Sequence, residues 1–254
     1  MTHVEVTHVE DPVIIALDFA SAAEADNLVA ALGDSARFYK VGMELYAAAG
    51  MDYVRRLTGL GKRVFLDMKY YDIGETVRRA TAVAAHSGAE FLTIHGVGQV
   101  MRAAIDGRGD SAMKLLAVTV LTSFDQQDVN ELGYDCALAE LVRQRVHLAM
   151  ETGVDGVVGS PVEARTIRAQ AGPAAILVTP GVRSRGVSAG DQKRVATPSD
   201  AVRDGANYVV IGREVTRSAD PAAALAAIHH DLQADRHKGR LHLVTSEARL
   251  QTHR

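Results

Sequence analysis

The chain has a single cysteine, and it lacks both a long apolar run and a large excess of charge of either sign. Cys136 alone cannot form an intramolecular disulfide, which favours a reducing, intracellular compartment. Charged, Gly or Pro residues interrupt every apolar run before the roughly 18 to 20 residues that a membrane-spanning helix needs. No apolar run flanked by basic residues suggests a signal peptide. We therefore expect a soluble, cytoplasmic protein with no membrane partner.

Charge and metal-ligand patterns exclude two further classes of function. The 28 Lys and Arg residues nearly balance the 31 Asp and Glu residues, which gives a formal net charge of −3. This balance provides no electrostatic case for nucleic-acid binding. The ten histidines form no HExxH pattern and the one cysteine forms no CxxC pattern, so we expect no zinc site.

The composition that remains is that of a globular protein, with 47% hydrophobic residues in 254. This length allows two small domains or one barrel of eight strands and eight helices, which typically has about 250 residues. Short apolar runs rich in β-branched residues predict eight strands. They lie at Val13–Leu17, Phe38–Val41, Val64–Leu66, Phe91–Ile94, Leu115–Val118, Gly156–Val158, Ile176–Val178 and Tyr208–Ile211.

Segments with helical spacing alternate with these runs. The clearest are Ala22–Leu32, Glu44–Thr58, Glu75–Ser87, Ala137–Thr152, Pro161–Ala171, Pro198–Asp204 and Ala222–Ile228. Parallel strands require crossover connections, so repeated strand and helix units favour a parallel sheet. No linker divides the chain. The predicted fold class is therefore α/β, a single (β/α)8 TIM barrel over residues 12–230, with an N-terminal arm at 1–11 and a polar C-terminal tail at 231–254.

Polar residues follow the predicted strands, and in a barrel all of these strand ends lie on one face, where active sites of this fold occur. The densest group is FLDMKYYDIGET, from Phe65 to Thr76. Strand side chains alternate between faces, so Asp67 and Lys69 should point the same way, with Asp72 beyond the strand and Lys40 on the neighbouring strand. Burial of an unpaired charge is costly, so these lysines and aspartates should form a compensating network. The alternative is an ion network that only fills the barrel.

Such a network would keep Lys69 protonated and so favour a general acid over a nucleophile. A fixed carboxylate such as Asp67 would repel a substrate carboxylate, and the combination suits decarboxylation followed by protonation of carbon. Schiff-base chemistry needs a neutral lysine in an apolar pocket, which these neighbours oppose.

A second group of residues has the pattern of a phosphate site. VTPGVRSRGVSAGDQKR begins at the end of the seventh predicted strand, and VIGREV begins at the end of the eighth. A Gly-rich loop and backbone amides at these two positions are the usual phosphate site of the barrel fold. Arg183 and Arg213 would supply charge and Gln192 a neutral donor. The alternative is a surface loop without a ligand.

From about Val13 to Ile228 the sequence resembles the orotidine 5′-phosphate decarboxylase family of the bacterial type. The resemblance lies in ALDF, YKVGMELY, FLDMKYYDI, AVTVLTS, DGVVGS, VTPGVR, GDQKR and NYVVIGREVT. It implies conversion of orotidine 5′-phosphate to UMP and CO2, the last step of de novo pyrimidine nucleotide synthesis, with no metal and no organic cofactor. It also implies a homodimer with active sites at the shared face.

The resemblance implies a role for each matching residue. Asp67 would lie against the departing carboxylate, and Lys69 would deliver a proton to C6 of the pyrimidine. Asp18 and Lys40 would contact ribose hydroxyls, with Lys40 also joining the charged network. Asp72, with Ile73 and Thr76, would reach into the site of the partner subunit. The remaining implied positions are Thr122 near the pyrimidine and Arg183, Gln192, Gly212 and Arg213 at the phosphate.

Two other functions are compatible with parts of this pattern. A metal-dependent sugar-phosphate decarboxylase or aldolase of the same barrel group keeps D-x-K-x-x-D. Such relatives carry an acidic metal ligand where Lys40 stands and usually an alanine where Ile73 stands. A non-catalytic sensor of phosphorylated metabolites would explain the phosphate pattern but leaves Lys69, between two carboxylates, without a purpose.

Overall fold

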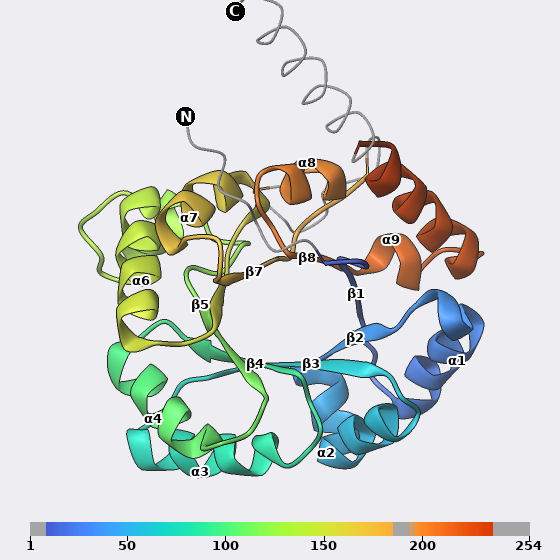
Figure 1. Ribbon diagram of the computed structural model, residues 1–254, viewed down its shortest axis with the longest axis horizontal. Coiled ribbons are helices and arrows are strands. Elements are labelled where there is room, and N and C mark those ends of the chain that lie inside the picture. The colour runs from blue at the N-terminus through green and yellow to red at the C-terminus, as the bar shows by residue number, and fades with distance from the viewer. Residues whose placement is uncertain (1–8, 185–193, 195, 236–254) are drawn as a thin grey trace, which may run out of the picture.

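The protein is a closed barrel of eight parallel strands surrounded by helices (Figure 1), which confirms the predicted (β/α)8 fold. The computed structural model describes residues 9–184, 194 and 196–235. The strands pair in chain order, and β8 closes the barrel against β1. They are β1 Val13–Ala16, β2 Phe38–Gly42, β3 Arg63–Tyr70, β4 Phe91–His95, β5 Lys114–Val118, β6 Gly156–Val158, β7 Ile176–Thr179 and β8 Tyr208–Ile211.

Helices form the outer ring, as Figure 1 shows. The α-helices are α1 Ala22–Leu32, α2 Met43–Gly59, α3 Gly74–Ala85, α4 Gly98–Arg108, α5 Gln126–Glu131, α6 Leu138–Thr152, α7 Ala164–Ala171, α8 Pro198–Arg203 and α9 Arg213–Thr216. Two short 3-10 turns, η1 Gly33–Ser35 and η2 Pro161–Glu163, follow α1 and precede α7. Residues 221–235 are also helical, so the last helix continues beyond the predicted end at Ile228. Among the described helices, none is long and apolar enough to cross a membrane.

The alternation of strand side chains divides the core into two parts. On β1, Val13 and Ile15 belong to the large cluster shared with the helices, whereas Ile14 and Ala16 belong to the smaller cluster inside the barrel. The same alternation on the other strands makes the interior a packed core rather than a channel, as is usual for this fold. Most strand residues are buried on both faces, which explains the nearly continuous apolar runs in the sequence.

Aromatic rings fill one layer of the barrel interior. Phe38, Phe65, Phe91 and Tyr208 are buried there, and their rings meet edge to face with centroids 5.1 to 5.9 Å apart. Because side chains alternate along a strand, the residue two positions after each phenylalanine points, like the phenylalanine, into the barrel. These residues are Lys40, Asp67 and Thr93, so the strands carry a polar layer directly above the aromatic one.

Strand β3 is longer and less regular than predicted. It spans Arg63–Tyr70, and its pairing with β4 shifts register between Leu66 and Tyr70. Leu66 pairs with Leu92 and Tyr70 with Ile94, so the three residues 67–69 lie opposite Thr93 alone. This β-bulge carries two of the predicted catalytic residues.

Candidate active site

Lys40 lies at the centre of a charged network at the carboxyl end of the strands. Its side chain is 11% exposed, and its Nζ donates a hydrogen bond to Asp18 Oδ1 at 2.8 Å. The same nitrogen lies 3.6 Å from Asp67 Oδ2. Strand β2 positions Lys40, and Asp18 follows β1, which pairs with β2 at Ala16 and Lys40. The neighbouring strand ends therefore bring the two charges together.

Lys69 completes this network from the bulge in β3. Its Nζ donates to Asp67 Oδ2 at 2.9 Å, so Asp67 accepts from one lysine and lies near a second. Lys69 has a φ of 50°, and it is the one non-glycine residue with positive φ among those described. Such a backbone conformation costs on the order of 1–3 kcal/mol, and strained residues of this kind cluster at functional sites.

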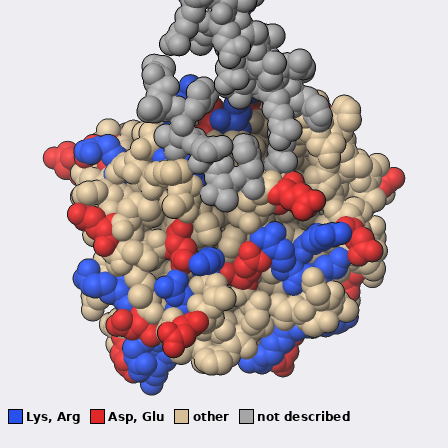
Figure 2. All heavy atoms as spheres, viewed as in Figure 1, with Lys and Arg blue, Asp and Glu red and all other residues tan. Residues whose placement is uncertain are grey.

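Lys40 and Asp67 stabilise each other's ionised form. Burial alone would raise the pKa of Asp67, but Lys40, Lys69 and a hydrogen bond from Thr93 hold that pKa below its usual value. Burial alone would lower the pKa of Lys40, but Asp67 and Asp18 hold that pKa above its usual value. Figure 2 shows acidic and basic side chains lying next to one another near the middle of the face in view.

A cavity of about 210 Å³ opens beside the network. Its polar wall includes Lys40, Asp67, Lys69, Thr122 and Ser123. The apolar wall comes from Phe65, Leu121, Val158, Pro180 and Val210. A substrate in this cavity would meet a fixed carboxylate and an ammonium group side by side, which can destabilise an anionic group and then supply a proton.

The segment around Asp72 lies outside the network of the single chain. Among the described residues no ion pair involves Asp72, whose carboxylate accepts the backbone N–H of Ile73 at 2.6 Å. Ile73 precedes α3 and is 71% exposed, and its neighbour Tyr71 is 67% exposed. Thr76 is half-buried in the first turn of α3. In one chain, Asp18 rather than Asp72 is thus the second carboxylate of the network.

The two predicted phosphate segments meet next to β7 and β8. Gly212 follows β8, and Arg213 is the first residue of α9. The backbone N–H of Ser184, directly after Arg183, donates to Glu214 Oε2 of α9 at 3.1 Å. The Arg183 guanidinium donates to the carbonyl oxygen of Val182 at 2.6 Å. Gln192 lies outside the described residues.

Two residues of the site were not predicted from the sequence. Thr93 of β4 is fully buried, and its hydroxyl contacts both Asp67 and the backbone of Lys69. Gly42, at the end of β2, leaves the space in which the Lys40 ammonium lies. The repeated pattern of Phe, any residue and a polar residue at FYK, FLD and FLT could have indicated Thr93, because alternation places all three polar residues inside the barrel.

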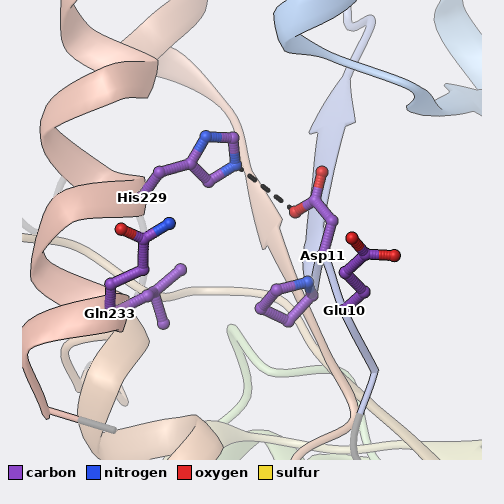
Figure 3. A pocket seen from close by; sticks show the side chains of 6 residues that line it. Glu10, Asp11, His229 and Gln233 are labelled. Carbon is purple, nitrogen blue, oxygen red and sulfur yellow. Dashed lines mark ion pairs between the residues drawn. The ribbon is translucent and has the colours of Figure 1, made fainter. Parts of the chain in front are cut away.

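A second cavity, of about 180 Å³, lies at the opposite end of the barrel, next to the residues that lead into β1. Figure 3 shows Asp11 and His229 pointing toward one another across it, with Asp11 Oδ1 and His229 Nε2 3.3 Å apart. No group of three or more His, Cys, Asp or Glu side chains suited to a metal ion occurs in the part of the chain that the structure describes.

Comparisons with known proteins agree on one family. The sequence profile described as "Orotidine 5'-phosphate decarboxylase / HUMPS family" matches residues 11–228. A protein of Nitrobacter winogradskyi named orotidine 5′-phosphate decarboxylase is 48% identical over 222 residues, which cover 87% of this chain and 92% of that protein. A protein of Methylobacterium radiotolerans with the same name is 48% identical over 228 residues, or 90% of this chain and 99% of that protein.

Solved structures show the same similarity. The crystal structure of orotidine 5′-phosphate decarboxylase from Lactobacillus acidophilus superimposes with a TM-score of 0.77 at 36% sequence identity. The match covers 88% of this chain and 99% of that one. An uncharacterized conserved protein from Geobacillus kaustophilus matches with a TM-score of 0.76, also at 36% identity, over 87% of this chain and all of that one.

Proposed function

The chain belongs to the orotidine 5′-phosphate decarboxylase / HUMPS family, and we propose that it converts orotidine 5′-phosphate to UMP and CO2 through the charged network of its barrel. The relatives at 48% identity are named decarboxylases, which makes this chain an enzyme, a carboxy-lyase. The observation that carries the mechanism is the contact of 2.9 Å between Lys69 Nζ and Asp67 Oδ2 beside the cavity.

Asp67 destabilises the bound substrate in this mechanism. A substrate carboxylate placed beside Asp67 meets a second negative charge, and that repulsion disappears when the carboxylate leaves as CO2. The bond between C6 and the carboxylate carbon breaks, and its electron pair stays at C6. Because Lys40 and Lys69 hold Asp67 ionised, the repelling charge is present over the whole neutral pH range.

Lys69 supplies the proton that completes the reaction. The ammonium group of Lys69 lies at the cavity wall, where it stabilises the electron pair that develops at C6 and then transfers a proton to that carbon. Lys40 holds Asp67 from the other side and, with Asp18, binds the ribose hydroxyls. This chemistry uses only side chains of the protein, so we propose that the reaction needs no metal and no organic cofactor.

The other predicted residues bind the substrate. Thr122 lines the cavity and would contact the pyrimidine. Arg183, Gln192, Gly212 and Arg213 would bind the phosphate. Asp72, with Ile73 and Thr76, would complete the site of a second copy of the chain in a homodimer, which fits the exposure of Tyr71 and Ile73.

The test is the loss of absorbance as orotidine 5′-phosphate is consumed, measured with a metal chelator present. We expect turnover in chelator, and strict dependence on added metal would instead favour the metal-dependent sugar-phosphate enzymes. Lys69→Ala should lower kcat by about 10²- to 10⁴-fold while binding of UMP, measured by calorimetry, persists. Lys114→Ala is the matched control, since Lys114 begins β5 at the far end of the barrel. Binding of orotidine 5′-phosphate without turnover in the unmodified protein would favour a sensor.

A further inference from the structure

Thr93 is a polar residue in the barrel interior whose side chain does not line the cavity. It lies on β4 between Leu92 and Ile94, and none of its surface is exposed. A threonine hydroxyl has one proton to donate and lone pairs that accept. A buried hydroxyl needs partners, so the identity of those partners indicates what the residue does.

Both partners of the Thr93 hydroxyl belong to the charged network. Thr93 Oγ1 accepts the backbone N–H of Lys69 at 2.8 Å. It donates its proton to Asp67 Oδ1 at 2.9 Å. The other carboxylate oxygen, Asp67 Oδ2, accepts from Lys69 Nζ. Asp67 is therefore held at both oxygens, and Thr93 is the neutral group that fixes its orientation.

The bulge in β3 explains why the backbone of Lys69 needs Thr93. Residues 67–69 lie opposite Thr93 alone, and Lys69 has the positive φ that this path requires. The N–H of Lys69 bonds a side-chain hydroxyl, a contact that stands in for a regular ladder bond to β4 at this point. The Thr93 hydroxyl thus has two effects. It stabilises the strained backbone that positions the Lys69 side chain, and it orients the Asp67 carboxylate that Lys69 contacts.

We propose that Thr93 is a positioning residue for the decarboxylation, which acts by holding Asp67 and the bulged backbone of Lys69 in their reactive arrangement. This role rests on the function proposed above. Thr93 itself does not touch the substrate in this arrangement, so its loss should slow the chemical step and leave substrate binding nearly unchanged.

The experiment compares Thr93→Val, which keeps the shape without the hydroxyl, with Thr93→Ser, which keeps the hydroxyl. Thr93→Val should lower kcat about 10- to 100-fold, with KM for orotidine 5′-phosphate and UMP affinity changed less than about threefold. Thr93→Ser should stay within about threefold of the wild type. Thr119→Val is the matched control, because Thr119 is equally buried and its hydroxyl donates instead to the carbonyl oxygen of Val158 at 3.0 Å.

The pH profile gives a second measurement that a merely structural role would not change. Without the Thr93 donor the ionised form of Asp67 is less stable, so the acid limb of the kcat profile should move to higher pH in Thr93→Val and not in Thr93→Ser. Thr93→Ala replaces Thr93→Val in the comparison with Thr93→Ser if the valine variant does not fold.

Three outcomes would overturn the inference. The first is a kcat of Thr93→Val within threefold of the wild type, and the second is an equal loss in the serine and valine variants. The third is a wild-type chain that does not convert orotidine 5′-phosphate, which overturns the proposed function and this role with it. If the wild type turns over orotidine 5′-phosphate normally and kcat of Thr93→Val is unchanged, only the positioning role of Thr93 is overturned, and the proposed function stands.

Discussion

The ammonium group of Lys40 occupies the space that a side chain on Gly42 would need. A Cβ atom on Gly42 would stand 2.9 Å from Lys40 Nζ and 3.1 Å from Asp18 Oδ1. The φ of Gly42 is −93°, an ordinary value for any residue, so the constraint is space and not backbone strain. Glycine at this position therefore allows the contact between Lys40 and Asp18.

This geometry predicts that Gly42→Ala lowers activity without unfolding the protein. The contacted atom is the flexible end of Lys40, which can move aside, so the fold should survive. The displaced ammonium would lose its place between Asp18 and Asp67, and we expect kcat/KM to fall about 10- to 100-fold. Gly59→Ala is the control, because a Cβ on Gly59 meets no atom within 4 Å. Equal kinetics for the two variants would contradict the prediction.

Most strands were predictable from the sequence because they are short apolar runs buried on both faces. Helices were harder to predict from the sequence where the local helix propensity conflicts with the fold. Helix α4 contains Gly98 and Gly107, which disfavour helix formation, and no side chain caps its start. Helix α5 has six residues and depends on a capping box formed by Asp125 and Asp128. Tertiary packing rather than propensity determines such elements.

The charged network was predictable because parallel strands of a barrel end on one face. The contact of Asp67 with Lys69 was expected from simple alternation, but the structure achieves it through a bulge and a positive φ at Lys69. Strand periodicity alone does not predict a bulge at a lysine. Thr93 was missed because threonine is common in strands and carries no charge.

The position of Asp72 allows a test of the proposed homodimer. Lys69→Ala and Asp72→Ala dimers should each be inactive, since each lacks one residue of every site. After subunit exchange, half of the dimers should be mixed, and each mixed dimer should contain one complete site. We therefore expect recovery of about a quarter of the wild-type activity, measured as orotidine 5′-phosphate consumption.

The control for this experiment mixes Lys40→Ala with Lys69→Ala. Both residues belong to the network of one chain, so no exchange can assemble a complete site from them. Recovery in this control, or no recovery with Asp72→Ala despite demonstrated exchange, would count against a site shared between subunits.

At the other end of the barrel, Asp11 joins the start of β1 to the helix of residues 221–235. Its carboxylate accepts the backbone N–H of Val13 at 3.0 Å and faces His229. Burial alone would raise the pKa of Asp11, but the contact with His229 and the bond from Val13 hold that pKa below its usual value. The ionised form of Asp11 thus stabilises the folded state.

Asp11→Asn removes this charge and keeps an oxygen that can accept the Val13 N–H. The pKa of Asp11 is lower in the folded state than in the unfolded state. The contribution of ionised Asp11 to the free energy of unfolding is therefore fully present above the pKa of the unfolded state, and it is lost as the pH falls through the pKa of the folded state. We expect Asp11→Asn to lower the free energy of unfolding in urea by up to about 1 kcal/mol at pH 7, and by less at a pH below the ordinary pKa of an aspartate. The exposed Asp34→Asn should show no difference at either pH, and an Asp11→Asn effect independent of pH would contradict the assignment.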